Sequence, residues 1–180
     1  MSPGPDPLAS AARLRLRPYT LDDEMSAREA NAIMEEGGWR LLLDWDQTTD
    51  WRTWLRTIDE HRRGLSLSVG LVPSVQLVAD VDGVIVGSVR VRFSLNKGLE
   101  RSGGHIGYGV LPAYRRRGYA TEMLRQALII ARSQGVKRVF VTCLDDNVGS
   151  ACVIERCGGK LEDVIDIDEG SQRLRRYSFT

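Results

Sequence analysis

The sequence is poor in cysteine and contains no long apolar run. It has 3 cysteines in 180 residues, an odd number without disulfide-like or metal-ligand spacing. No stretch approaches the ~20 apolar residues of a membrane-spanning helix. Residues 1–12 have neither the basic region nor the apolar core of a signal peptide. We therefore expect a cytoplasmic protein without a metal, whose residues 1–12 form a disordered tail.

The sequence also lacks an excess of charge of either sign. Its 25 Lys and Arg residues against 24 Asp and Glu residues give a formal net charge of +1. This balance argues against a surface dedicated to nucleic acid or to a membrane, so we expect neither as a partner. With 42% hydrophobic and 27% charged residues the composition is that of a globular protein, and we expect a single domain over residues 13–180.

Hydrophobic periodicity predicts a mixed α/β order of elements. The two runs 75–81 and 84–93 flank Asp82-Gly83, which predicts a hairpin with a type I′ turn. A helix over 48–63, capped by Thr48 or Thr49, would bury Trp51 and Trp54. The other expected elements are strands over 13–17, 105–110, 139–142, 160–167 and 174–179, helices over 20–36, 119–133 and 147–156, and a loop over 94–104.

The most informative stretch joins the strand ending at Val110 to the helix over 119–133. The first N–H groups of a helix lack partners and carry partial positive charge, so they attract an anion. Gly118 lets the backbone approach a pyrophosphate, and the arginines 115–117 add mobile positive charge. The pattern fits neither the dinucleotide Gly-x-Gly-x-x-Gly motif nor a P-loop. It indicates another polyphosphate ligand, unless the arginines form only a solvated surface and Gly118 only a turn.

This Arg-x-x-Gly-x-Ala turn, preceded by Val110-Leu111-Pro112, resembles the acyl-CoA motif of the GCN5-related N-acetyltransferase (GNAT) superfamily. A second stretch, from Asn147 through Ser150 to Gly158, resembles the Asn-x-x-Ser helix of the same family. The resemblance implies a mixed α+β fold: a mostly antiparallel, twisted sheet of about six or seven strands, splayed between strands four and five, with about four flanking helices. It also implies direct transfer of an acetyl group from acetyl-CoA to a primary amine of a small molecule or peptide.

The resemblance further implies a role for each matching residue. Backbone groups of Val110 and Leu111 would contact the pantetheine arm and polarise the thioester carbonyl. The side chains of Asn147 and Ser150 would contact the other end of the cofactor, although Asn147 could equally be the N-cap of its helix and Ser150 a packing hydroxyl. The pyrophosphate would lie on the backbone N–H groups of Arg116, Arg117, Gly118, Tyr119, Ala120 and Thr121, with the side chains of Arg115, Arg116 and Arg117 beside the adenosine phosphates.

The catalytic groups are less clearly marked. Many members of the family carry a proton-donating tyrosine seven residues after the Asn, but position 154 is Ile. Water or Ser150 could protonate the departing thiolate, whose reference pKa is about 8.5. His105 is the candidate base, because relatives often carry Glu just ahead of Ile-Gly-Tyr and a pKa of about 6.5 suits proton abstraction. Its alternative is a strand histidine bonded to a neighbouring carbonyl, and His61 is expected at the surface.

The acceptor site is poorly specified by the sequence. In the family it is formed by the first two helices and by loops beside the splayed strands. Acidic and aromatic residues there could hold an ammonium group, or could be solvated charges and core tryptophans. They are Trp39, Asp44, Trp45, Asp46, Asp50, Asn96, Lys97, Glu100, Asp166, Asp168 and Glu169. An acyl-CoA-binding protein without catalysis, a nucleic-acid-binding protein using the arginines of 115–117 and 173–176, and a homodimer formed through the closing strands remain alternatives.

Overall fold

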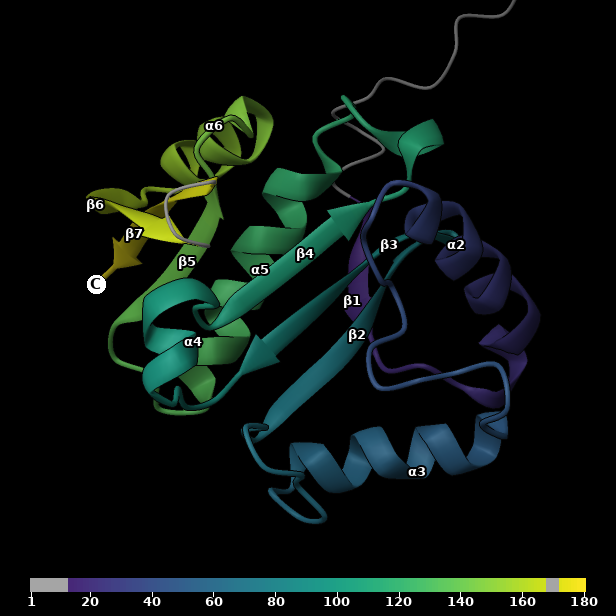
Figure 1. Ribbon diagram of the computed structural model, residues 1–180. Helices are drawn as coiled ribbons and strands as arrows, with labels where there is room; N and C mark the ends of the chain where they lie inside the picture. Colours follow the sequence, from purple (N-terminus) through teal and green to yellow (C-terminus); the bar gives the residue numbers. More distant parts are fainter. Residues whose placement is uncertain (1–12, 168–171) are drawn as a thin grey trace, which may run out of the picture.

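A computed structural model describes residues 13–167 and 172–180 (Figure 1). The expected tail over 1–12 and two expected acceptor residues, Asp168 and Glu169, lie outside the described residues. The elements in chain order are β1 (Arg15–Arg17), η1 (Leu21–Asp23), α2 (Glu24–Glu36), α3 (Trp51–Arg62), β2 (Ser74–Val81), β3 (Val84–Arg92), α4 (Lys97–Ser102), β4 (Ile106–Val110), η2 (Pro112–Tyr114), α5 (Tyr119–Ser133), β5 (Val139–Leu144), α6 (Val148–Arg156), β6 (Lys160–Ile167) and β7 (Gln172–Phe179).

The strands form two antiparallel sheets that meet at one point. One sheet has the order β1-β2-β3-β4 and the other the order β5-β7-β6. At the junction the backbone N–H of His105 donates to the carbonyl of Phe140 at 2.7 Å, and Gly104 bridges to Val141. Beyond it β4 and β5 diverge and share no ladder within the described residues (Figure 1). The expected α/β fold, splayed between the fourth and fifth strands, is confirmed.

Helices cover both faces of the four-stranded sheet (Figure 1). α5 lies on one face because its apolar stripe, which includes Met123, Leu124 and Ala127, is fully buried against β3 and β4. α2 and α3 cover the other face. There Trp51 and Trp54 pack with ring centroids 4.7 Å apart in a second core cluster, as the periodicity predicts. Alternate residues of β3 therefore face opposite helical layers.

The turn between β2 and β3 is confirmed, because Asp82 and Gly83 have φ values of 53° and 85°, the signs that a type I′ turn requires. The N-cap of α3 was predicted wrongly. It is Asp50, whose carboxylate accepts from the Thr53 N–H at 2.9 Å, because the loop carrying Thr48 and Thr49 ends one residue later than expected.

The expected loop over 94–104 contains the short helix α4, which is capped by Asn96 and has too few residues to show a periodic pattern. His61 is not at the surface: it is 5% exposed, because it lies on the inner side of α3 with Trp54. Among the described helices, none combines the length and apolar character needed to cross a membrane. The described residues also contain no group of three or more His, Cys, Asp or Glu side chains that could hold a metal ion.

Candidate functional site

The turn between η2 and α5 leaves backbone donors without acceptors. Arg116 and Gly118 have φ values of 64° and 81°, so the chain curls tightly before the helix begins. Within the described part of the chain, the N–H groups of Arg116, Arg117, Gly118 and Ala120 find no acceptor. They stand at the N-terminus of α5, where the helix dipole adds positive potential. The donors that the predicted pyrophosphate site requires are therefore present, while the site itself remains a prediction.

Other groups of this turn are already engaged. Arg115 donates from Nε to the carbonyl of Val110 at 3.1 Å. Arg117 donates to the carbonyl of Ala113 at 3.1 Å and lies over the ring of Tyr114. Two of the three arginines thus hold the turn in shape. The N–H of Thr121 donates to the carbonyl of Gly118 at 3.1 Å, so the predicted backbone contact of Thr121 with a pyrophosphate lacks a free donor.

The edge of β4 next to β5 presents backbone groups to the space between the sheets. The Leu111 N–H donates to the carbonyl of Val86 at 2.9 Å, which places Leu111 in a hydrogen-bonded pair with β3. Antiparallel alternation then turns the N–H groups of Tyr108 and Val110 away from β3, toward β5. Val110 is positioned as its predicted role requires. The Leu111 N–H belongs to the β3–β4 ladder and its carbonyl accepts from the Tyr114 N–H, so Leu111 has no free N–H for the pantetheine arm and its predicted contact stays a prediction.

A tyrosine hydroxyl lies beside α6, although it comes from β4. The hydroxyl of Tyr108 lies 2.9 Å from Oγ of Ser150. Burial raises the pKa of Tyr108 to about 12, so the phenol is protonated at neutral pH. Ile154, one turn further along α6, is fully buried in the core and offers no polar group. The sequence does not mark Tyr108 as a catalytic candidate, because its contact with Ser150 joins segments that are 42 residues apart in the chain.

Asn147 and Cys143 flank this contact. Asn147 caps α6, since its Oδ1 accepts from the Ser150 N–H at 3.0 Å. Its Nδ2 finds no acceptor among the described residues, so a cofactor contact remains compatible with the cap. Cys143 is buried on β5, and desolvation raises the pKa of its thiol. A nucleophilic thiolate is disfavoured at such a position.

His105 lies at the junction of the two sheets. Its Nδ1 accepts from the Phe140 N–H at 3.0 Å, and the two rings stack with centroids 6.1 Å apart. The hydrogen-bond partner of His105 is thus an N–H, whereas a strand histidine bonded to a neighbouring carbonyl was the alternative to the base role. Burial, with a smaller contribution from the positive charge of Arg92, lowers the pKa of His105. Because Nδ1 uses its lone pair here, the neutral ring carries its proton on Nε2 and has no free lone pair for the predicted base role.

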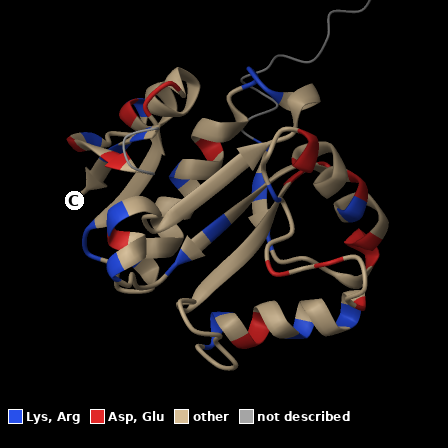
Figure 2. Cartoon of the chain, in the orientation of Figure 1, with Lys and Arg blue, Asp and Glu red and all other residues tan. Residues whose placement is uncertain are grey.

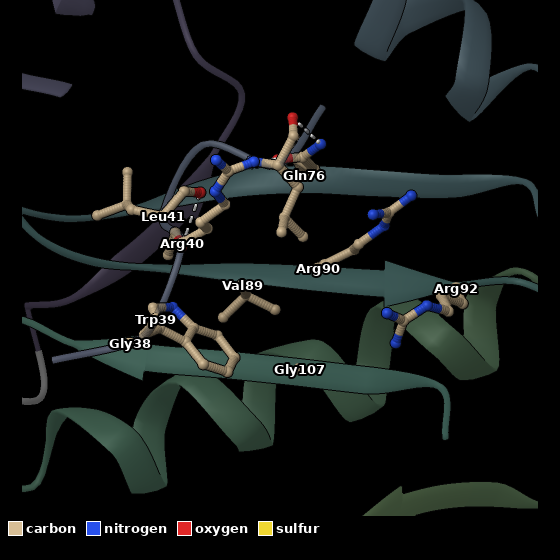
Figure 3. Close-up of a pocket in the computed structure, with 11 residues that line it drawn as sticks. Gly38, Trp39, Arg40, Leu41, Gln76, Val89, Arg90, Arg92 and Gly107 are labelled. Atoms are coloured by element: carbon tan, nitrogen blue, oxygen red, sulfur yellow. Dashed lines mark hydrogen bonds between the residues drawn. The ribbon is translucent and has the colours of Figure 1, made fainter. Parts of the chain in front are cut away.

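A cavity of about 210 Å³ opens on the face of the sheet opposite α5 (Figure 3). Trp39 lies over the β4 side of the cavity, next to Gly107. Because Gly107 has no side chain, the cavity extends down to the backbone of β4 at this point. Arg90 and Arg92 of β3 both line the cavity, with the guanidinium group of Arg90 toward β2 and that of Arg92 toward β4 (Figure 3). The sequence analysis did not identify these arginines, because single basic residues in an alternating strand ordinarily face solvent.

The other expected acceptor residues are scattered. Asp44 lies near Arg90, and Trp45 is buried in the second core. Asp46 is exposed in the loop before α3, and Asp166 pairs with Arg173 at the surface. The remaining expected residues serve as helix caps or lie in α4: they are Asp50, Asn96, Lys97 and Glu100. Trp39 is thus the expected residue that lines the cavity.

Comparison with known proteins gives a consistent family and fold. The family model described as "Acetyltransferase (GNAT) domain" matches residues 13–160. Mycobacterium smegmatis RimJ in complex with CoA-disulfide is 18% identical, with 92% of this chain and 81% of RimJ covered and a TM-score of 0.67. RimL, a ribosomal L7/L12 alpha-N-protein acetyltransferase, in complex with coenzyme A is 18% identical, with 96% of each chain covered and a TM-score of 0.62.

A third structure is the microcin C7 self-immunity acetyltransferase MccE in complex with acetyl-CoA and AMP. It is 18% identical, with 98% of this chain and 97% of MccE covered and a TM-score of 0.61. No curated protein matches the sequence significantly. At these identities the solved structures show a shared fold.

Proposed function

The chain belongs to the GNAT acetyltransferase family, and on that premise we propose that it transfers the acetyl group of acetyl-CoA to a primary amine of a small molecule or peptide. The proposal is carried by the four free backbone donors at the N-terminus of α5, at the mouth of the space between β4 and β5. The bound CoA of RimL and the bound acetyl-CoA of MccE support the choice of donor.

The turn before α5 holds the phosphates in this proposal. The N–H groups of Arg116, Arg117, Gly118 and Ala120 donate to the pyrophosphate oxygens, and the dipole of α5 adds to the attraction. Arg116 is exposed and supplies a further positive charge from solvent. The N–H groups of Tyr108 and Val110 face the space that the pantetheine arm fills, and they donate to its amides and to the acyl carbonyl oxygen.

Tyr108 and Ser150 stabilise the departing thiolate. The phenol has a pKa of about 12, well above the roughly 8.5 of a thiol. A full proton transfer from Tyr108 to the thiolate is therefore uphill, and Tyr108 acts as a hydrogen-bond donor while water supplies the proton. This arrangement replaces the tyrosine that the family commonly places at position 154, which is Ile here.

Calorimetry with two substitutions at Gly118 tests the cofactor site. The native protein is expected to bind acetyl-CoA with micromolar affinity. Gly118→Asp places a negative charge at the free donors and should weaken binding at least 10-fold. Gly118→Asn is the matched control, because Asn has nearly the same shape, carries no charge and tolerates a positive φ. Equal loss in both variants would mean that backbone strain, and not charge, explains the effect.

Turnover is measured as release of free CoA thiol in the presence of a panel of primary amines. Amine-dependent release supports transfer to nitrogen. Binding without release by any amine would contradict the proposed activity and would leave a CoA-binding protein without catalysis. Absence of binding by the native protein would contradict the cofactor site as well.

A further inference from the structure

Arg90 is a buried cation with incomplete charge compensation. It is 8% exposed, and its Nε donates to the hydroxyl of Ser74 at 3.1 Å. The nearest carboxylate is that of Asp44, whose oxygen lies 3.6 Å from Nη2. That distance is too long for a good charge-assisted hydrogen bond. Asp44 also faces His61 at 3.9 Å, so its charge is shared between two neighbours.

Arg92 adds a second, half-buried cation on the same face. Its Nη1 donates to the carbonyl of Gly104 at 3.1 Å. In the described part of the chain, no carboxylate lies within the 4.0 Å of an ion pair with Arg92. Burial, and then the positive charge of Arg90, lowers the pKa of Arg92 to about 10. Two guanidinium groups, that of buried Arg90 and that of half-buried Arg92, thus stand near a single acidic group, Asp44, and a charge removed from water without a partner is costly.

Both guanidinium groups reach the same cavity (Figure 3). Arg90 and Arg92 are two residues apart on β3, so their side chains leave the same face of the sheet from Cα atoms about 7 Å apart. Figure 2 shows basic residues within β3 at the centre of the sheet, away from the mixed charges of the helices. A carboxylate or phosphate between the two forks could accept hydrogen bonds from both.

The other polar side chains of the cavity do not neutralise the positive charges of Arg90 and Arg92. Arg40 at the rim pairs with Glu35 at 3.2 Å. The amide of Gln76 is engaged by the backbone of Leu43, and the hydroxyl of Ser88 donates to the carbonyl of Leu41. These neutral side chains shape the cavity and supply no counter-charge.

We propose that this cavity binds the anionic group of the acetyl acceptor, so that the acceptor is a small molecule carrying both a primary amine and a carboxylate or phosphate. The inference rests on the proposed function. The cavity lies over Gly107 of β4, the strand that presents Tyr108 and Val110 to the acetyl donor. Its 210 Å³ equals about seven waters at roughly 30 Å³ each, which suits a molecule of amino-acid size.

A panel of matched amines tests the charge preference. β-Alanine and O-phosphoethanolamine carry the two anionic groups, and β-alaninamide and ethanolamine are their counterparts without an anionic group. We expect kcat/KM for at least one anionic amine to exceed that of its uncharged counterpart by 10-fold or more, with the difference shrinking as salt is raised. The better of the two anionic amines identifies the group as carboxylate or phosphate. Equal use of charged and uncharged amines would overturn the inference and leave the acetyltransferase function intact.

Substitutions of opposite expected effect separate binding from folding. Arg90→Gln and Arg92→Gln should raise KM for the preferred anionic amine about 10-fold or more, and Arg92→Lys should restore part of the loss. Asp44→Asn should lower that KM, because the carboxylate competes with the ligand for Arg90. Asp44 has a φ of 60°, which Asn tolerates. Arg62→Gln, on the exposed side of α3, is the control and should change nothing. A higher KM in every variant, Asp44→Asn included, would indicate a structural role only.

Equilibrium binding makes the inference testable without turnover. N-acetyl-β-alanine and N-acetyl-O-phosphoethanolamine are titrated against N-acetyl-β-alaninamide into the CoA-loaded protein, native and Arg92→Gln. Preferential binding of an anionic compound, lost in the variant, supports the anion site even if no amine is acetylated. Failure of all three to bind, together with amine-dependent thiol release, would overturn the inference while the proposed function stands.

Discussion

At the scale of single residues, Tyr108 has a role that a substitution can isolate. Tyr108→Phe removes the hydroxyl near Ser150 and keeps the ring in place. Loss of one hydrogen-bond donor to a developing charge should lower kcat about 10-fold, since each 1.4 kcal/mol corresponds to a factor of ten. The KM for acetyl-CoA should stay nearly constant, because the phosphates are bound elsewhere. Steady-state thiol release measures both constants, and a change confined to KM would contradict the role.

His105 gives a pH dependence whose sign follows from its environment. Its pKa is lowered by burial and by Arg92, so as pH falls the unfolded chain takes up the proton before the folded protein does. The contribution of His105 to stability is therefore lost as pH drops below about 6.5 toward the lower folded-state value. His105→Asn keeps an acceptor for the Phe140 N–H and removes the titration. Urea unfolding between pH 7.5 and 5.5 should show a smaller loss of unfolding free energy for this variant.

The same variant decides the role of His105 in catalysis. A general base contributes about 100-fold or more, so its loss would lower kcat/KM by at least that factor. The bond between Nδ1 and the Phe140 N–H leaves the neutral ring without a free lone pair, and we expect a change of less than about 3-fold. A 100-fold loss in His105→Asn, with acetyl-CoA affinity unchanged, would restore the base role that the sequence suggests.

At the scale of elements, the two glycines of β4 make unequal contacts with Trp39. A Cβ at Gly109 would lie 2.6 Å from Nε1 of Trp39 and 2.8 Å from Cε of Met34, whereas a Cβ at Gly107 would meet Trp39 only at 3.8 Å. Gly109→Ala should therefore displace Trp39 from the cavity, shift its fluorescence and raise KM for the acceptor amine. Gly107→Ala is the matched control for the position of Trp39 and should leave its fluorescence nearly unchanged. Equal effects of the two substitutions would mean that Trp39 does not depend on close contact with β4.

Element by element, the sequence predicts structure best where the pattern is long or the turn chemistry is specific. The apolar stripe of α5 and the Asp82-Gly83 turn are local signals, and both are confirmed. α4 was missed because six residues give less than two turns of periodicity. The Tyr108–Ser150 contact and the placement of Arg90 and Arg92 in one cavity arise only when distant elements come together, so no local sequence pattern indicates them.

At the scale of the whole molecule, two sheets joined at one junction should be stabilised by a ligand that lies between them. The free donors before α5 and the side chain of Asn147 belong to opposite sides of the space between β4 and β5. A ligand at 100 times its Kd adds about 2.7 kcal/mol to the free energy of unfolding. At roughly 2–4 °C per kcal/mol for a chain of this length, CoA should raise Tm by about 5–10 °C.

A thermal melt with desulfo-CoA separates this effect from thiol chemistry. Desulfo-CoA retains the phosphates and most of the pantetheine arm, so it should raise Tm nearly as much as CoA, whereas a mixed disulfide with Cys143, Cys152 or Cys157 cannot form. Gly118→Asp should reduce both shifts by about half or more, because its charge opposes the pyrophosphate and a 10-fold weaker Kd removes about 1.4 kcal/mol of the stabilisation. A shift seen with CoA alone, and removed by a reducing agent, would show that a cysteine and not the turn before α5 holds the ligand. Equal shifts with both ligands exclude a mixed disulfide, and their reduction in Gly118→Asp assigns part of the binding energy to the turn before α5.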